Sequence, residues 1–157
     1  HERVLYEKFL SDARAGTPDV QGLFQPQTLE LPAAHAALML SHADAFSHLG
    51  FDIEQFGDRA FVVRAVPASM ASDVAGRVLE LLDRMQRDDG AQDRAHRVAA
   101  SLACHASVRA GMTLSAEEQR ELLRGLEGAA SPRTCPHGRP TVVHLSADAI
   151  AREFRRK

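Results

Sequence analysis

The residues best suited to chemistry are two cysteines, each with a histidine close by. One pair is Cys104-His105, and the other lies in the segment Cys135-Pro136-His137-Gly138-Arg139-Pro140, written CPHGRP. In that segment a thiol and an imidazole stand two residues apart, in a turn that prolines stiffen and a glycine frees. Thiolate and imidazole are ligands of zinc and similar borderline metals. The pattern therefore suggests a metal site.

The residues alone leave a second interpretation of Cys104 open. A cysteine in an alanine-rich helix is often a small buried apolar residue with no chemical role. His105 beside it is interpreted as a plain surface histidine, and no role is assigned to His1.

Composition narrows the class of protein. The chain has 157 residues, of which 45% are hydrophobic and 25% charged, a balance typical of a soluble domain or two small subdomains. No apolar run approaches the about 20 residues that a membrane crossing needs. The net charge of −2 argues against tight binding of DNA by this chain alone, because Lys and Arg supply most non-specific affinity. No secretory context accompanies the cysteines, which favours reduced thiols.

The elements that must position these residues follow from apolar periodicity and from turn residues. Leucines and alanines at helical spacing predict helices, and β-branched alternation between prolines and glycines predicts strands. The predicted helices cover residues 1–14, 33–49, 73–86, 92–109, 116–127 and 146–154, and the predicted strands cover 20–31, 51–56, 60–66 and 141–145. Because no regular alternation of strand and helix occurs, the fold class is predicted to be α+β.

Several segments, in order along the whole chain, resemble the C-terminal domain of the MutL family of DNA mismatch-repair proteins. CPHGRP is the most distinctive of them, and the others are HERVLYE at residues 1–7, the hairpin at 50–68, ACHASVRA at 103–110 and Phe154-Arg155-Arg156. Glu2 and Glu7 match the end of the family signature Asp-Gln-His-Ala-x-x-Glu-x-x-x-x-Glu. The leading Asp, Gln, His and Ala of that signature are not in this chain, which is therefore expected to be a piece of a longer protein with an impaired site.

The resemblance implies a metal-dependent endonuclease that nicks double-stranded DNA. The implied ligands of Mn²⁺ or Zn²⁺ are Glu2, Cys104, Cys135 and His137. Glu2 and Arg139 are the implied catalytic residues, and Glu7, Phe154 and Arg156 are supporting residues. Arg139 has an alternative role in holding its turn, and Arg156 an alternative as a solvated helix end. ATP is not expected to bind this domain.

Two other functions compete with this one. Some members of the family lack the metal motifs and serve only to dimerise and to bring partners together, although CPHGRP and Cys104 weigh against that for this protein. A structural zinc domain of unrelated fold would need four closed ligands, which the same four residues could supply.

The resemblance also implies how the chain is divided. Residues 1–31 and 93–157 would form a dimerisation and metal-site subdomain, and residues 32–92 an inserted regulatory subdomain. A homodimer is expected, with the alanine-rich segment 99–110 and Leu122, Leu123 and Leu126 as its surface. The implied partners are double-stranded DNA, the replication sliding clamp and a mismatch-recognition protein, with no membrane. The implied location is the cytoplasm, in association with the nucleoid.

The segment Gln27-Thr28-Leu29-Glu30-Leu31-Pro32 is the candidate for contact with the clamp. Extended peptides place alternate side chains in apolar pockets, so Leu29 and Leu31 would be the plugs, Gln27 the polar anchor and Pro32 the end of the motif. At least one of the two leucines is then expected to be exposed. Alternation alone fits equally well a strand whose leucines lie in the core.

Overall fold

The computed structural model describes residues 1–87, 93–109 and 111–154. It has helices and a small sheet. In chain order the elements are α1 (Glu2–Ala15), β1 (Val20–Glu30), α2 (Ala33–Ser41), α3 (Ala43–His48), β2 (Asp52–Gln55), β3 (Ala60–Pro67), the short 3₁₀ helix η1 (Ala68–Met70), α4 (Val74–Arg87), α5 (Arg94–Ala106), α6 (Ala116–Glu127) and α7 (Ala147–Glu153). The mixture confirms the predicted α+β class.

The sheet has the strand order β1-β3-β2, and both pairings are antiparallel. Strands β2 and β3 form the predicted hairpin, which turns at Gly57 and Asp58. The pairing of β1 with β3 shifts register between Gly22 and Gln27. Pro26 lies in that interval, and a residue without an N–H is tolerated in a strand at such an irregularity. The Phe24 side chain there is 100% exposed.

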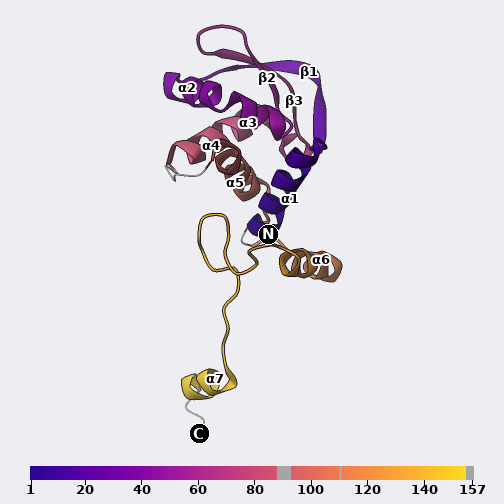
Figure 1. Ribbon diagram of the computed structural model, residues 1–157, viewed down its shortest axis with the longest axis vertical. Coiled ribbons are helices and arrows are strands. Elements are labelled where there is room, and N and C mark those ends of the chain that lie inside the picture. The colour runs from indigo at the N-terminus through magenta and orange to yellow at the C-terminus, as the bar shows by residue number, and fades with distance from the viewer. Residues whose placement is uncertain (88–92, 110, 155–157) are drawn as a thin grey trace.

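Helices α2 to α5 lie on one side of the sheet (Figure 1). Strand β3 supplies the fully buried Phe61, Val63 and Val66, which share one core cluster with the apolar stripes of α4 and α5. The stripe predicted for α4 is confirmed, because Val74, Val78, Leu81, Leu82 and Met85 are all buried. One core cluster contains residues of the segment 32–92 together with Tyr6 and Leu10 of α1 and residues 98–103 of α5.

Helix α5 packs against both α1 and α4, so it joins the first helix of the chain to the inserted segment. Its alanines Ala99, Ala100 and Ala103 are buried at this junction. Small side chains allow the neighbouring backbones to approach closely, as the composition of this segment predicted. The tyrosine hydroxyl of Tyr6 also forms a hydrogen bond with Nδ1 of His96, which ties α1 to α5.

The single helix predicted for residues 33–49 is wrong, because the chain forms two helices that break at His42. The imidazole Nδ1 of His42 lies 3.1 Å from the Leu38 carbonyl oxygen, and the Ser41 hydroxyl donates to the same carbonyl at 2.9 Å. Side chains that bond to nearby carbonyls compete with the backbone ladder of a helix. These contacts give the physical reason for the break.

In the C-terminal part, the two helices predicted from the sequence are present, and the one predicted strand is absent from the described residues. The capping box of α6 is confirmed: Ser115 Oγ accepts the Glu118 N–H at 3.2 Å, and Glu118 accepts the Ser115 N–H at 2.7 Å. Ser146 caps α7 as predicted. The predicted strand 141–145 is wrong, because these residues pair with no strand within the described ranges. They lead to α7, which Figure 1 shows away from the other helices.

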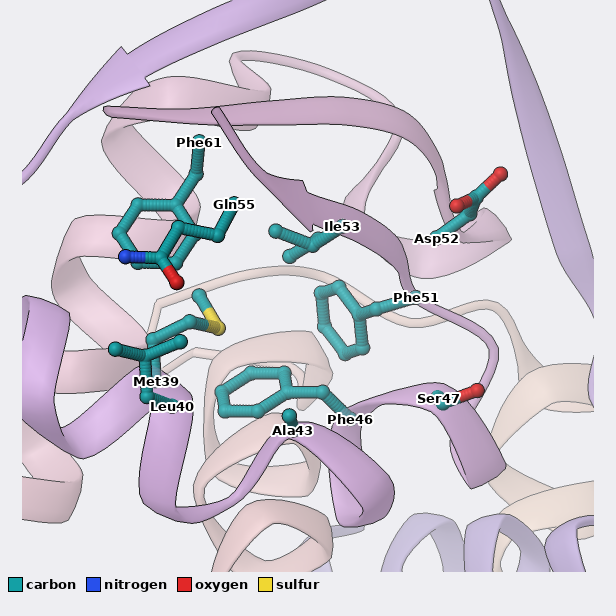
Figure 2. A pocket seen from close by; sticks show the side chains of 10 residues that line it. All are labelled: Met39, Leu40, Ala43, Phe46, Ser47, Phe51, Asp52, Ile53, Gln55 and Phe61. Atoms are coloured by element: carbon teal, nitrogen blue, oxygen red, sulfur yellow. The ribbon is translucent and has the colours of Figure 1, made fainter. Parts of the chain in front are cut away.

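A cavity of about 260 Å³ lies in the inserted segment, between α2, α3 and β2. Figure 2 shows the rings of Phe46 and Phe51 in it, which meet edge to face with centroids 5.1 Å apart. None of the residues that line it is one of the predicted site residues. Within the described ranges, no helix combines the length and the apolar character needed to cross a bilayer.

Candidate metal centre

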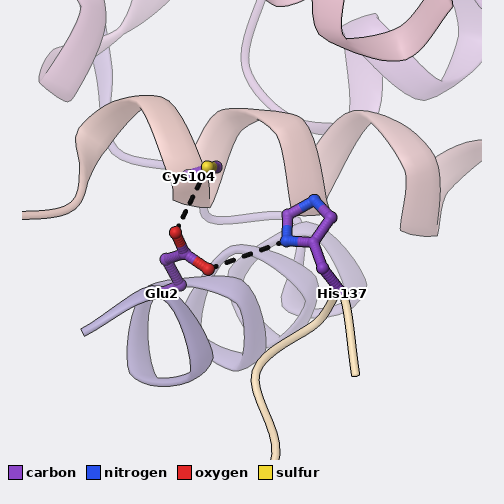
Figure 3. A group of neighbouring side chains, drawn as sticks. All are labelled: Glu2, Cys104 and His137. Carbon is purple, nitrogen blue, oxygen red and sulfur yellow. Dashed lines mark hydrogen bonds and ion pairs between the residues drawn. The ribbon is translucent and has the colours of Figure 1, made fainter. Parts of the chain in front are cut away.

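Three of the four predicted metal ligands meet at one point, from three distant segments of the chain. Glu2, Cys104 and His137 each offer a ligand atom, and these atoms all lie within 4.8 Å of one another. Figure 3 shows the Glu2 carboxylate between the other two side chains: Sγ of Cys104 donates to Oε1 at 3.2 Å, and Nδ1 of His137 lies 3.6 Å from Oε2. A carboxylate, a thiol and an imidazole therefore face a common space.

Two packed helices position the first two of these residues. Glu2 opens α1, Cys104 lies in the last turn of α5, and the two helices pack against each other. Ala103 is fully buried in the helix interface. Cys104 follows it on the helix, so its side chain lies at the edge of the interface and is half-buried. The site thus forms where two helix ends meet.

A tight turn presents His137. The Cys135 N–H donates to the Arg139 carbonyl at 2.7 Å, and the Gly138 N–H donates to the Cys135 carbonyl at 3.0 Å. Gly138 has a φ of +80°, a left-handed conformation that a glycine adopts without a Cβ penalty. The turn predicted from the prolines and the glycine of CPHGRP is confirmed.

Side chains of α1 hold the loop that leads into this turn. The Glu7 carboxylate accepts the N–H groups of Ala130 at 2.7 Å and Ser131 at 3.2 Å. Nε of Arg3 donates to the Thr134 carbonyl at 2.6 Å. The same helix therefore carries Glu2 and anchors the loop that brings His137 to it.

Cys135 does not belong to the group of three. Its side chain is buried, and Sγ accepts the Arg139 N–H at 3.3 Å, which helps to close the turn. Cys135 and Glu2 line the same smaller cavity, of about 230 Å³, beside the group. The role of Cys135 as a fourth ligand stays a prediction.

The surroundings of the Cys104 thiol favour its neutral form over the thiolate. Burial raises its pKa, and the hydrogen bond to Glu2 and the negative charge of that carboxylate raise it further. The guanidinium groups of Arg84 and Arg139 oppose this and lower the pKa. Because a metal binds the thiolate, loading this site would release the thiol proton.

Arg84 is a neighbour of the site that sequence reasoning missed. Its Nη1 donates to Sγ of Cys104 at 2.8 Å, from α4 in the inserted segment. Nothing in the sequence separates Arg84 from the other arginines of α4, since all lie off its apolar stripe. Only packing of α4 against α5 selects it.

The interpretation of His105 as a surface residue is wrong. Its side chain is only 2% exposed, and Nδ1 lies 3.1 Å from the Glu80 carboxylate. Burial and the nearby Arg77 lower its pKa, although Glu80 acts in the opposite direction. His105 is directed toward Glu80 of α4 and does not belong to the group of Glu2, Cys104 and His137.

The remaining predicted residues are placed as follows. Arg139 lines a large pocket with Cys104 and His137, and Phe154 is 75% exposed at the end of α7. Arg156 lies outside the described residues. These positions place Arg139 beside the site and Phe154 on the surface.

The exposure predicted for the clamp segment is wrong. Leu29 is 6% exposed and Leu31 is 1% exposed, and both belong to the core cluster. Leu29 pairs with Phe61 of β3, and both side chains are buried. Gln27 and Pro32 are exposed. The leucines therefore stabilise the sheet in this structure.

Comparison with known proteins identifies the family. The family model described as the MutL C terminal dimerisation domain matches residues 1–114. The DNA mismatch repair protein MutL of Koribacter versatilis is 38% identical over 160 residues, which cover 99% of this chain and 25% of that protein. The protein of the same name from Pelotomaculum thermopropionicum is 41% identical over 160 residues, covering 99% of this chain and 26% of that protein.

The MutL of Symbiobacterium thermophilum is 39% identical over 163 residues, with 99% of this chain and 26% of that protein covered. The chain thus spans about a quarter of the length of the curated relatives it matches. With a family match over residues 1–114 and identity that extends across 99% of its length, this chain belongs to the MutL family, in the region of its C-terminal dimerisation domain.

Proposed function

We propose that this chain is the part of a MutL mismatch-repair protein that holds catalytic metal for nicking double-stranded DNA and that pairs two copies. The observation that carries the nicking function is the meeting of Glu2, Cys104 and His137 from three segments. Helix packing alone does not require a carboxylate, a thiol and an imidazole to share one space.

The donor set fits a divalent metal. Two ligand atoms that each bind zinc at about 2.0–2.3 Å can stand at most about 4.6 Å apart, and the contacts at 3.2 and 3.6 Å satisfy this. Three protein ligands with an open position are typical of catalytic zinc, whereas structural zinc has four closed ligands. The softness of sulfur favours Zn²⁺ over Mg²⁺ or Ca²⁺. A bound metal would polarise a phosphate oxygen and lower the pKa of a coordinated water.

Glu2, Cys104 and His137 would hold the metal, and Glu7 and Arg3 would keep the His137 loop in register with α1. Glu2 Oε1 accepts a hydrogen bond from the Cys104 thiol, which orients the sulfur toward the carboxylate. Arg139 would add positive charge beside the reacting phosphate. These roles follow from the contacts of the chain's own residues.

Metal binding by single variants tests this proposal. We expect His137→Ala and Cys104→Ser to weaken Zn²⁺ binding in equilibrium dialysis by on the order of 100-fold or more, because even outer contacts of metal ligands cost 10–100-fold. His144→Ala is the matched control, since His144 is an exposed histidine seven residues away that is not in the group. The full-length protein carrying His137→Ala should also lose Mn²⁺-dependent nicking of supercoiled plasmid. Equal Zn²⁺ affinity of His137→Ala and His144→Ala would contradict the metal site.

A second function, a dimerisation module without catalysis, is favoured by a different observation. The family model is described as a dimerisation domain and ends at residue 114, before Cys135 and His137. Plasmid nicking by the full-length protein separates the two functions, because a module of this second kind would dimerise normally and leave the plasmid intact.

A homodimer is supported by the distribution of apolar surface. Between residues 112 and 154, Met112, Leu123, Val142, Val143, Leu145, Ile150 and Phe154 are exposed, and the core cluster contains no residue of that range. Contiguous apolar surface marks interaction sites, and we propose that these side chains form such a surface with a second copy. Ala99, Ala100 and Ala103 of the predicted interface are buried within the chain, so Leu123 and the segment 142–154 are the better candidates.

The two-part organisation, with residues 1–31 and 93–157 separate from 32–92, is kept as a proposal about function. The three grouped ligands come from the end segments, whereas the cavity of Figure 2 lies in the inserted one. The inserted segment would then regulate a site that the chain ends build.

Contact with the sliding clamp is also kept as a proposal, through Gln27 and Pro32, which are exposed. Docking of Leu29 and Leu31 would require the end of β1 to leave the sheet, because both leucines are buried. A mismatch-recognition protein is proposed as a further partner of the full-length protein, acting with it at the nucleoid.

A further inference from the structure

A large open pocket is lined by four arginines from segments that lie far apart in the sequence. It adjoins the three grouped ligands Glu2, Cys104 and His137, called the metal group below. The pocket has a volume of about 1140 Å³ and contains Glu2, Cys104 and His137 in its wall. Its arginines are Arg84, Arg87, Arg109 and Arg139. They come from α4, from the segment after α5 and from the CPHGRP turn.

The charge of this pocket is opposite to that of the chain. Four arginines and the two carboxylates Glu2 and Glu80 leave its wall with a formal charge of +2, whereas the whole chain has 19 basic and 21 acidic residues and a net charge of −2. A local surplus of positive charge in a cleft concentrates its field there. The pocket therefore suits a polyanion.

Two of the arginines are close to the metal group. Arg84 donates to the Cys104 sulfur through Nη1, and a guanidinium has five N–H donors, so further donors remain for a ligand. Arg139 acts electrostatically on the same sulfur. An anion held by these two side chains would lie next to the proposed metal.

The other two arginines extend the positive surface outward. Arg87 is 78% exposed, its Nη2 lies 4.0 Å from the Asp83 carboxylate, and its spacing of three residues from Arg84 puts both arginines on one face of α4. Arg109 is 65% exposed and lies 3.9 Å from Glu80, a long contact between exposed groups that leaves much of its charge available.

We propose that Arg84 and Arg87 of the inserted segment bind the phosphodiester backbone of double-stranded DNA and position it at the metal group. This inference rests on the proposed nicking function and deepens it. Guanidinium groups match phosphate oxygens in planar, two-point hydrogen bonds, and a pair of them one helical turn apart can follow a strand. The inserted segment then forms part of the substrate site, beyond a purely regulatory role. Arg84 and Arg87 act as positioning residues.

The test is DNA binding without metal. The full chain, in a chelator at low salt, is titrated into a fluorescent DNA duplex, and anisotropy gives the affinity at several salt concentrations. Each phosphate contact removed should lower the slope of log affinity against log salt by about 0.9. We therefore expect R84Q/R87Q to reduce that slope by up to about 2 and to weaken binding at low salt by on the order of 10-fold or more.

The matched control is R59Q/R64Q. Its arginines are 55% and 49% exposed, they lie on the hairpin turn and β3, and neither lines the pocket. Loss of affinity in R84Q/R87Q with normal binding by R59Q/R64Q supports the proposal. Equal binding by the two double variants overturns it. Exposed substitutions of this kind change stability little, which circular dichroism checks.

The outcome also separates this inference from the nicking function. Arginine-dependent DNA binding in a full-length protein that never nicks would contradict the catalytic proposal and leave the DNA-binding pocket supported. Nicking that persists unchanged in full-length R84Q/R87Q at low DNA concentration would contradict the positioning role.

Discussion

At the scale of single residues, the site depends on contacts that aim the ligands as much as on the ligands. Cys104 and His137 would lie apart without the helix packing and the loop that bring them to Glu2. Glu7, predicted as a supporting residue, has a defined contact: it holds the Ala130 and Ser131 N–H groups through both carboxylate oxygens. Hydrogen bonds from backbone N–H groups to a carboxylate are among the stronger ones.

Glu7→Ala should weaken metal binding while the domain stays folded. The loop of residues 130–134 would lose its anchor on α1, and His137 would be less often in place. We expect Zn²⁺ affinity to fall by about 10–100-fold, as for other outer contacts of metal sites. Equilibrium dialysis measures this affinity. The control is Glu54→Ala, because Glu54 is an exposed glutamate of β2 that pairs only with Arg64 of β3 among the ion pairs described. Unchanged Zn²⁺ affinity in Glu7→Ala would show that the CPHGRP turn holds His137 in place without the contacts of Glu7.

His42 should make stability depend on pH. Burial lowers its pKa, with Arg97 and Arg94 acting in the same direction and the Leu38 carbonyl against it. The unfolded chain, with an ordinary histidine pKa of about 6.5, therefore takes up a proton that the folded chain resists. This contribution to stability is present above about pH 6.5 and is lost as the pH falls below it.

Urea unfolding at about pH 8 and about pH 5.5 measures this loss, on either side of the ordinary histidine pKa. His42→Asn should show a smaller drop between the two pH values than the unaltered chain. His48→Asn, which replaces an exposed histidine bonded to the Asp44 carbonyl, should keep the full drop. Identical pH dependence in all three proteins would show that other groups are responsible.

At the scale of elements, β1 carries two incompatible demands at its C-terminal end. Leu29 and Leu31 complete the core under the sheet, and the clamp hypothesis asks the same leucines to reach a partner. Burial of two leucines is worth several kcal/mol, since each contributes about 1.5–3 kcal/mol. The structure favours the core role.

Leu31→Ala should therefore destabilise the domain by about 2–5 kcal/mol, as large-to-small changes in cores do. Gln27→Ala, at an exposed position of β1, should change the free energy of unfolding by less than about 0.5 kcal/mol. Urea unfolding measures both. A stability loss below about 1 kcal/mol for Leu31→Ala would mean that the strand end separates easily, and it would revive the leucines as clamp contacts.

At the scale of the whole molecule, the described residues after 111 contribute exposed apolar side chains and none of the members of the core cluster. Its exposed apolar side chains and the separate position of α7 in Figure 1 indicate that this part packs against something outside the single chain. The family description as a dimerisation domain makes a second copy the natural partner.

We expect V143D and F154D to weaken the homodimer by about 30-fold or more each, or about 2 kcal/mol, because a charge in an apolar interface loses its hydration without a partner. F56D is the control, since Phe56 is 79% exposed at the end of β2, outside the C-terminal segment. Analytical ultracentrifugation gives the dissociation constants. Equal dimerisation of all three variants would place the interface elsewhere.

Local patterns by themselves determined much of this protein. Apolar periodicity located α4, the capping box of Ser115 and Glu118 started α6, and Gly57-Asp58 marked the hairpin, because each depends on residues a few positions apart. The CPHGRP turn is of the same kind, since its prolines and Gly138 restrict the backbone directly. The family and three of its candidate ligands could be named from such motifs.

Tertiary packing alone decided the rest. The burial of His105, Leu29 and Leu31 and the contact of Arg84 with Cys104 all depend on which face of an element meets another one. Residues 141–145 have a strand-like sequence but form no strand, since a strand needs a partner for its backbone groups. The spacing of apolar residues in the sequence shows which face of a helix or strand is apolar. Only the assembled core determines which residues that face contacts.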